Sequence, residues 1–192
     1  MSDNPEMDET MMAAGADRRI ESTAPAEGAG GFGLYYAVVC GVVALDIVTK
    51  LMAQAMLPAY RPIPILGEFF RLTYIYNPGA AFGLHLGENS RFIFLALSAI
   101  AVVVLYRMYR TTPREDLLRR VAIATVTGGA LGNLIDRIRS VHGVVDFLDF
   151  GIPGGARFPV FNVADIAVTI GAILLAISLW TEDHDAARDA DA

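Results

Sequence analysis

Four long apolar segments constrain the fold of this chain more than any other feature of its sequence. A helix needs roughly 20 predominantly apolar residues to cross a bilayer. Segments of about this length, with few charges at their centres, occur at residues 32–56, 91–110, 119–138 and 158–181. The chain is 54% hydrophobic and only 19% charged, which is more apolar than an ordinary soluble domain. We therefore predict an all-α membrane protein with four transmembrane helices.

Charged residues are concentrated at the two ends of the chain. Residues 1–31 hold seven acidic and two basic residues, and residues 182–192 hold five acidic and one basic. The first of these segments is also rich in Ala, Gly and Glu and cannot bury a core, so we expect a disordered acidic N-terminal extension. The membrane domain is then expected over residues 32–181, followed by an acidic cytoplasmic tail over 182–192.

The loop between the second and third segments predicts how the chain is oriented. Its sequence RMYRTTPREDLLRR, residues 107–120, places five arginines within 14 residues. The connectors 57–91 and 136–157 each carry three arginines over greater lengths. Short loops rich in Lys and Arg stay in the cytoplasm, so both termini are predicted to be cytoplasmic. Topology explains these arginines, and no partnership with nucleic acid is expected.

The connector over residues 58–89 differs from an ordinary loop. It contains FFRLTYIY, a run of aromatic and β-branched residues that is typical of a strand, followed by the turn signal NPG. On the orientation above, this connector lies outside the cytoplasm. We predict that it forms a small extracytoplasmic β-sheet resting on the membrane.

Ionisable and amide side chains gather at one depth of the predicted helices. On this topology Asp46 and Lys50 lie in the outer half of the first helix. The outer ends of the third and fourth helices add Asn133, Asp136, Arg137, Asn162 and Asp165. Ionisable groups in a membrane are costly and mark functional sites. Unrelated structural charges have no reason to share a depth, so a site is predicted near the outer membrane surface.

Several charged residues also have structural interpretations. Asp46 and Lys50 have the i,i+4 spacing of an ion pair, and Asp136 is placed to pair at a helix end. Asp149 is interpreted as a solvated loop residue. On these grounds alone, a structural role is favoured for each of the four.

The GGALG motif predicts close packing of the third helix. Gly128 and Gly132 form a GxxxG pattern, which lets another helix approach closely. We expect this pattern to bring the third and fourth helices together at the level of the acidic residues.

Asp146 and Asp165 have no such simple structural explanation. Asp165 has no basic residue within one turn of its own helix, and Asp146 lies in the apolar run VVDFLDF. From position alone, a functional and a structural role are equally open for each. If the two face each other in a small wet cavity, like charges at close range share one proton. One carboxyl then serves as general base and the other as general acid.

Three other catalytic arrangements stay open with less support: a Cys–His nucleophile, a Ser–Lys pair and a metal site. Their candidate residues are Cys40, Lys50 with Ser140 or Ser90, and His85 with His142. No metal-ligand spacing is present in the sequence, and no metal or cofactor is predicted. A proton-coupled transporter and a non-enzymatic scaffold are the alternatives of other classes. A transporter would need polar positions through the whole membrane depth, whereas the inner halves of the predicted helices are nearly free of them.

Five short motifs occur in a fixed order: ALDIVTK at 44–50, NPGAAFG at 77–83, GGALGNLIDRI at 128–138, VVDF at 144–147 and FNVADIAV at 161–168. Together they resemble the ordered signature of the lipoprotein signal peptidases, also called signal peptidase II, over about residues 32–180. The resemblance implies a bacterial inner-membrane aspartic endopeptidase with four transmembrane helices and an extracytoplasmic β-cradle. Members cleave a prolipoprotein just before its diacylglyceryl-modified cysteine. The expected partners are therefore such precursors and membrane lipids, and we expect the chain to function as a monomer.

Matched motif by motif, the resemblance implies that Asp146 and Asp165 are the catalytic pair. The implied substrate-binding residues are Asn77, Asn133, Arg137 and Asn162. The supporting residues are Asp46, Lys50, Asp136, Gly128 and Gly132. The acidic segments at the two ends of the chain have no counterpart in this signature.

Overall fold

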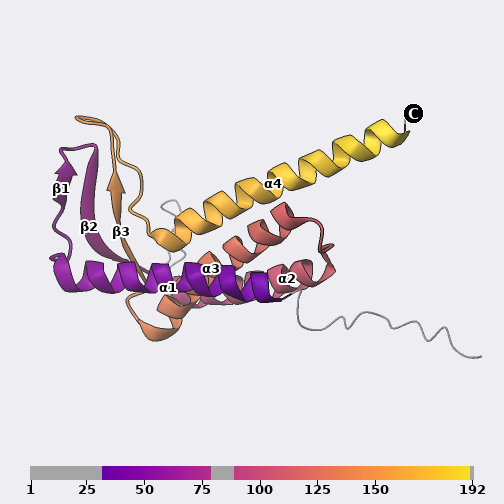
Figure 1. The fold of residues 1–192 in the computed structure, drawn as a ribbon. Coiled ribbons are helices and arrows are strands. Elements are labelled where there is room, and N and C mark those ends of the chain that lie inside the picture. The colour runs from indigo at the N-terminus through magenta and orange to yellow at the C-terminus, as the bar shows by residue number, and fades with distance from the viewer. Residues whose placement is uncertain (1–31, 79–88, 191–192) are drawn as a thin grey trace, which may run out of the picture. The chain divides into compact units, whose positions relative to one another are not determined.

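The computed structural model describes residues 32–78 and 89–190, so the N-terminal extension, most of NPGAAFG and His85 lie outside the described residues. Its elements follow in the order α1 (Gly33–Met56), β1 (Ile63–Leu66), β2 (Phe70–Asn77), α2 (Ser90–Thr111), α3 (Leu117–Arg139), β3 (Val144–Phe150) and α4 (Val163–Ala190). Figure 1 shows the strands at one end of the helices and the α2–α3 loop toward the other.

Three helices are long and apolar enough to cross a membrane: α1, α2 and the Val163–Glu182 part of α4. The fourth helix, α3, has 23 residues, which is sufficient length. It is less apolar because it begins with LLRR and ends with DRIR. Composition and length therefore support three of the four predicted spans.

α3 is the central helix, because it packs against α1, α2 and α4. A Cβ added at Gly128 would lie 2.7 Å from Cβ of Val42 on α1, and one at Gly129 would collide with the carbonyl oxygen of Ala164 on α4. A Cβ at Gly132 would meet residues of both α1 and α4. The expected close packing of α3 and α4 is therefore present, but Gly128 allows the approach of α1 and not of α4.

Aromatic rings fill the interior toward the α2–α3 loop. The rings of Tyr35 and Tyr109 have centroids 4.6 Å apart, and the Arg120 guanidinium lies 4.5 Å from the centroid of Tyr109. Arg120 is only 6% exposed and donates a hydrogen bond to the Tyr109 hydroxyl. Arg120, which the sequence assigns to the arginine-rich loop, is therefore buried among these rings. We call these residues the aromatic cluster: Phe32, Tyr35, Tyr106, Tyr109 and Arg120.

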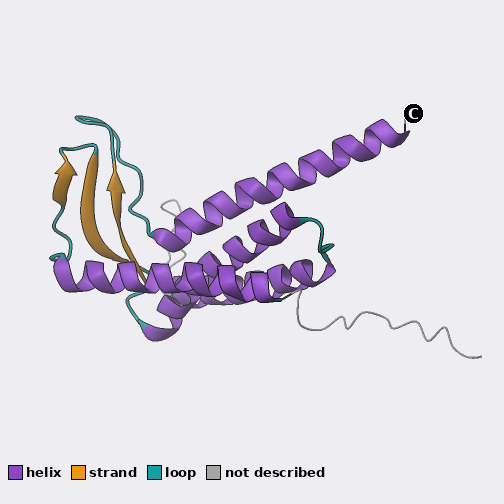
Figure 2. Ribbon diagram, viewed as in Figure 1, coloured by secondary structure: helices purple, strands orange, loops and turns teal. Residues whose placement is uncertain are grey.

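The sheet has three antiparallel strands in the order β1-β2-β3, which Figure 2 shows side by side. The expected strand FFRLTYIY is present as β2, and the 58–89 connector also contributes β1, which was not predicted as a separate strand. The third strand, β3, is formed by VVDFLDF and was not predicted. Its register opposite β2 pairs Ile75 with Asp146 and Asn77 with Val144. β3 thereby brings Asp146 beside the end of β2.

α4 begins five residues later than predicted and ends later as well. Residues 158–162 are extended and hydrogen bond to β3. Pro159 favours an extended conformation in the residue before it, which apolar content alone does not indicate. The helix begins at Val163 and continues to Ala190, so the predicted start at 158 is wrong. The part long and apolar enough to cross a membrane ends at Glu182, next to the predicted end at 181.

Candidate active site

The first turn of α4 is held by a reciprocal cap. Asn162 Oδ1 accepts a hydrogen bond from the Asp165 N–H at 3.0 Å, and Asp165 Oδ2 accepts one from the Asn162 N–H at 3.1 Å. Asp46 of α1 accepts the N–H of Ala164 at 2.9 Å. The first N–H groups of a helix have no partner within it, so these acceptors stabilise the start of α4. The same bonds fix the direction of the Asp165 carboxylate.

Asn133 of α3 connects three of the predicted site residues. Its Nδ2 donates to Asp165 Oδ1 at 2.8 Å. Its Oδ1 accepts hydrogen bonds from Asn162 Nδ2 at 3.1 Å and from Lys50 Nζ at 3.0 Å. α1, α3 and α4 therefore meet in one hydrogen-bonded network.

Asp146 joins this network from β3. Its side chain is almost completely buried, at 1% exposure. Its Oδ1 accepts a hydrogen bond from Asn162 Nδ2 at 2.7 Å, and its Oδ2 accepts one from Asn77 Nδ2 at 2.9 Å. Asn162 thus hydrogen bonds to both Asp146 and Asp165, and holds the two carboxylates at one place.

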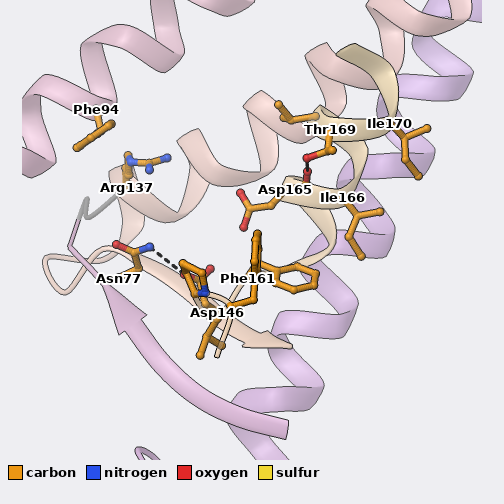
Figure 3. Close-up of a pocket in the computed structure, with 13 residues that line it drawn as sticks. Asn77, Phe94, Arg137, Asp146, Phe161, Asp165, Ile166, Thr169 and Ile170 are labelled. Atoms are coloured by element: carbon orange, nitrogen blue, oxygen red, sulfur yellow. Dashed lines mark hydrogen bonds between the residues drawn. The ribbon is translucent and has the colours of Figure 1, made fainter. Parts of the chain in front are cut away.

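Both aspartates line a cavity of about 490 Å³. Figure 3 shows Asp146 and Asp165 facing it from different elements, with Asn77 and Arg137 on another side. Of the predicted substrate-binding residues, Asn77 and Arg137 line the cavity, whereas Asn133 and Asn162 lie behind the carboxylates. Apolar side chains form the rest of the wall, among them Phe94, Phe158, Phe161, Ile166 and Ile170.

Asp146 has an unusual affinity for a proton. Burial, followed by the negative charge of Asp165, raises its pKa to about 7. The hydrogen bonds from Asn77 and Asn162 and the charge of Lys50 act in the opposite direction but do not cancel the increase. Near neutral pH the Asp146 carboxyl therefore exists in both protonation states, as a general acid or base requires.

Arg137 presents a cation to the cavity. Its Nη1 donates to the Asn133 carbonyl at 3.2 Å, and its guanidinium lies 5.6 Å from the centroid of the Phe94 ring. Nε is buried and has no hydrogen-bond partner among the described residues. Arg91 of α2 donates to the Arg137 carbonyl at 2.9 Å. Arg137 is therefore anchored on one side, and its guanidinium lines the cavity, where a cation suits a carbonyl or carboxylate oxygen.

Lys50 lies behind the pair and is 3% exposed. Its Nζ is 2.7 Å from Asp46 Oδ2, as the i,i+4 spacing predicted, and 2.8 Å from Asp136 Oδ2. Together with Asn133 these groups place three oxygen atoms around the ammonium. A lysine held in this way does not act as the base of a Ser–Lys pair.

Asp149 is not the solvated loop residue that its sequence context suggested. It is 3% exposed, and its carboxylate accepts hydrogen bonds from Arg71, Thr73 and Arg157. Burial alone would raise the pKa of Asp149, but these bonds outweigh burial and hold the pKa below its usual value. Asp149 therefore joins the sheet to the segment that leads into α4.

The remaining candidates do not join the network. Cys40 is exposed on α1. His142 stacks beside the Tyr76 ring with centroids 5.2 Å apart. Within the described part of the chain, no group of three or more His, Cys, Asp or Glu residues is arranged to hold a metal ion.

Two features of the site were not predicted from the sequence. The apolar wall, including Phe94 of α2, has no signal that separates it from lipid-facing residues of the same helices. The Arg157–Asp149 contact joins residues eight apart, and only recognition of β3 as a strand could have suggested it.

The fold is shared with solved bacterial membrane enzymes. A structure described as a bacterial membrane enzyme at 2.3 Å resolution has a TM-score of 0.71 and 33% identity, covering 80% of this chain and 91% of that one. A second, at 1.9 Å resolution, has a TM-score of 0.67 and 34% identity, covering 77% and 92%. With its three apolar helices, the chain is a multi-pass membrane protein of this class.

Sequence comparison identifies the family. The family described as Signal peptidase (SPase) II matches residues 38–181. The lipoprotein signal peptidase of Moorella thermoacetica is 41% identical over 148 residues, covering 77% of this chain and 93% of that protein. The lipoprotein signal peptidase of Yersinia pseudotuberculosis is 44% identical over 146 residues, covering 74% and 82%. The chain belongs to the signal peptidase II family and is a peptidase.

Proposed function

We propose that this protein removes signal peptides from prolipoproteins by cleaving before the diacylglyceryl-modified cysteine, with Asp146 and Asp165 activating water. One observation carries the proposal: both carboxylates line one cavity, and Asn162 donates to an oxygen of each. The substrate class follows from the relatives, which are named lipoprotein signal peptidases.

Asp146 carries the proton of the resting pair, and Asp165 serves as the base. This assignment is supported by the greater burial of Asp146 and by its pKa of about 7. Asp165 takes a proton from water, the water oxygen attacks the scissile carbonyl carbon, and Asp146 protonates the carbonyl oxygen. As the C–N bond breaks, Asp165 gives its proton to the leaving nitrogen, and a hydroxyl proton returns to Asp146. The pair ends in its starting state.

The two sides of the cavity suit the two parts of such a substrate. Arg137 and Asn77 offer polar groups to the peptide backbone, so binding energy can fix the attack geometry. The apolar wall formed by Phe158, Ile166 and Ile170 suits acyl chains or the apolar signal helix. Asn133 and Asn162 then act by orienting the carboxylates instead of contacting substrate.

α3 is the fourth transmembrane helix in this proposal. At about 1.5 Å per residue its 23 residues span about 34 Å, which exceeds the roughly 30 Å hydrocarbon core. Because it packs against the other three helices, little of its surface faces lipid, and it needs less apolar character. Its polar C-terminal residues meet those of α1 and α4 inside the protein.

The arginine-rich α2–α3 loop supports a cytoplasmic location for that end of the helices. Both termini are then cytoplasmic, and the sheet and the aspartate pair lie near the outer leaflet of the inner membrane. The acidic segments 1–31 and 182–192 lie outside the peptidase domain, 32–181. The protein is proposed to function as a monomer.

The test is cleavage of a synthetic precursor by the purified full-length protein in lipid bilayers. A peptide with a diacylglyceryl-modified cysteine is compared with the same peptide unmodified. We expect cleavage of the modified peptide alone, at the bond before the cysteine, as read by mass spectrometry. Equal cleavage of both peptides, or cleavage at another bond, contradicts the proposed specificity. Proton flux in liposomes without peptidase activity would instead support the transporter alternative.

A further inference from the structure

Lys50 is buried next to the aspartate pair but lies outside the proposed substrate cavity. It lines a second cavity of about 190 Å³, together with Gln54, Asp136 and Ser140. The two cavities share no lining residue. A substrate in the larger cavity therefore does not meet Lys50, and any effect of this lysine on the reaction passes through other side chains.

Asn133 is the side chain through which Lys50 reaches the pair. Lys50 Nζ donates to Asn133 Oδ1 at 3.0 Å, and Asn133 Nδ2 donates to Asp165 Oδ1 at 2.8 Å. An ammonium has three donors and no acceptor. Turning the Asn133 amide round would therefore place its NH₂ group against Nζ. Lys50 thus permits only one orientation of the Asn133 amide, in which its NH₂ group donates to Asp165.

A donor on a carboxylate oxygen favours the ionised form of that carboxylate. The positive charge of Lys50 acts in the same direction on Asp146. Asp46 and Asp136 hold the ammonium in place at 2.7 and 2.8 Å. These two carboxylates also offset much of its charge, so removal of either one strengthens the field of Lys50 at the pair.

We propose that Lys50 is a positioning residue of the peptidase, which locks the Asn133 amide toward Asp165 and sets the pH range in which the pair carries one proton. The proposal rests on the proposed function of Asp146 and Asp165 as that pair. Lys50 is not a catalytic residue, because it neither lines the larger cavity nor contacts the reacting groups.

Other charges surround the pair and must be separated from Lys50. The charged side chains around it are Asp46 and Lys50 of α1 and Asp136 and Arg137 of α3. Within the pair, Asp146 of β3 lies opposite Asp165 of α4. Arg91 of α2 donates a hydrogen bond to the Arg137 carbonyl. Arg137 also favours ionised carboxylates. Because it lines the cavity, its replacement changes substrate binding, whereas replacement of Lys50 is expected to change kcat more than KM.

The test is the pH profile of kcat/KM with the diacylglyceryl-modified peptide. Lys50→Met removes the charge and the donor, so both limbs of the profile should move to higher pH by about one unit. Lys50→Arg keeps the charge, and its profile should stay at the wild-type position even if kcat falls. Asp136→Asn is the matched control of opposite sign: it removes a negative charge beside Lys50 and should move the profile to lower pH.

A Lys50→Met profile that superimposes on the wild-type profile, with only its height reduced, overturns the proposal. If thermal denaturation shows that Lys50→Met is not folded, Asp136→Asn and Lys50→Arg decide the question. A profile that fails to move to lower pH in Asp136→Asn then overturns it. Failure of the wild-type protein to cleave the modified peptide is a different result, which refutes the proposed function itself.

Discussion

The two ends of the helix bundle bury charged groups in opposite ways. In the aromatic cluster, Arg120 packs on Tyr109 and donates to its hydroxyl at 2.8 Å. Neither of the two cavities is lined by a residue of that cluster. At the other end, Asp146 and Asp165 open on a cavity of about 490 Å³. Burial of charge is common to both ends, but of these three charged residues only the two aspartates line either cavity.

β3 repeats this contrast within one strand. Asp146 and Asp149 are three residues apart and are both almost completely buried. Amide donors contact Asp146, and its pKa is about 7. Guanidinium groups contact Asp149, and its pKa lies below the usual value. At Asp149 the hydrogen bonds from Thr73, Arg157 and Arg71 outweigh burial, whereas at Asp146 burial and the negative charge of Asp165 outweigh the hydrogen bonds from the two amides.

The contrast is tested most strongly by removing either carboxylate of the pair. Asp146→Asn and Asp165→Asn are each expected to lower kcat by about 10³-fold or more, because no acid or base of the pair remains at that position. The midpoint of thermal unfolding should change little, since Asn keeps the shape of the side chain. Near wild-type turnover by either variant would remove the distinction between the two ends.

Asn162 tests whether the bridge between the carboxylates matters. Asn162→Ala removes the donor to Asp146 and the cap of α4. Misplacement of the carboxylates is expected to lower kcat about 10²-fold, and loss of the cap to lower the free energy of unfolding by about 1 kcal/mol. Activity assays and thermal unfolding of the same preparation separate these effects. A loss of stability without a loss of kcat would show that Asn162 only caps the helix.

Arg120 provides the complementary test at the aromatic cluster. Arg120→Met removes a charged hydrogen bond and a cation–π contact, so the free energy of unfolding should fall by about 2 kcal/mol. The value of kcat/KM per folded molecule is expected to stay at the wild-type level. A selective loss of kcat in this variant would link the aromatic cluster to the chemistry and contradict the difference between the two ends of the bundle.

The contacts of Asp149 predict that the stability of the protein, but not its catalysis, depends on this residue at acid pH. Its folded pKa is lowered, so its stabilising effect is complete above the unfolded pKa of about 3.9 and is lost as pH falls through the folded value. Thermal unfolding midpoints should therefore drop below about pH 4 in the wild type. In Asp149→Asn this drop should be smaller, from a midpoint already lowered at neutral pH. An equal acid drop in both proteins would assign it to other groups.

The smallest change in stability is expected when Asp116 is replaced. It caps α3 by accepting the Arg119 N–H at 2.9 Å, and Asn is an equally good capping residue. Asp116→Asn should change the free energy of unfolding by less than about 0.5 kcal/mol and leave kcat unchanged. It serves as the matched Asp-to-Asn control for the two aspartates of the pair.

The helices and the gathering of polar residues could be predicted from the sequence because both follow from the membrane. Apolar length defined α1 and α2 closely, and depth along each helix brought Asp46, Asn133 and Asp165 to one level. The i,i+4 spacing also predicted the contact between Asp46 and Lys50. These features depend only on residues close in sequence and on a lipid bilayer, whose apolar interior excludes charge.

The third strand and the start of α4 depend on pairing between distant residues and could not be predicted in this way. VVDFLDF becomes a strand because it lies beside β2, about 70 residues earlier in the chain. Arg71, which hydrogen bonds to Asp149, is 78 residues away in the chain. The sequence around Asp149 therefore suggests only a polar loop. Apolar content likewise extends the predicted α4 back to residue 158, although the cap at Asn162 starts the helix.

Asp146 and Asp165 are proposed to share one proton, and infrared spectroscopy of the carboxyl groups as a function of pH can detect that proton. A protonated carboxyl band that disappears in Asp146→Asn should titrate with a pKa of about 7 in the wild type. In Asp165→Asn the same band should titrate at lower pH, because the neighbouring negative charge is gone. An Asp146 carboxyl that is already fully ionised at pH 5, or one that titrates identically in both proteins, would contradict the account.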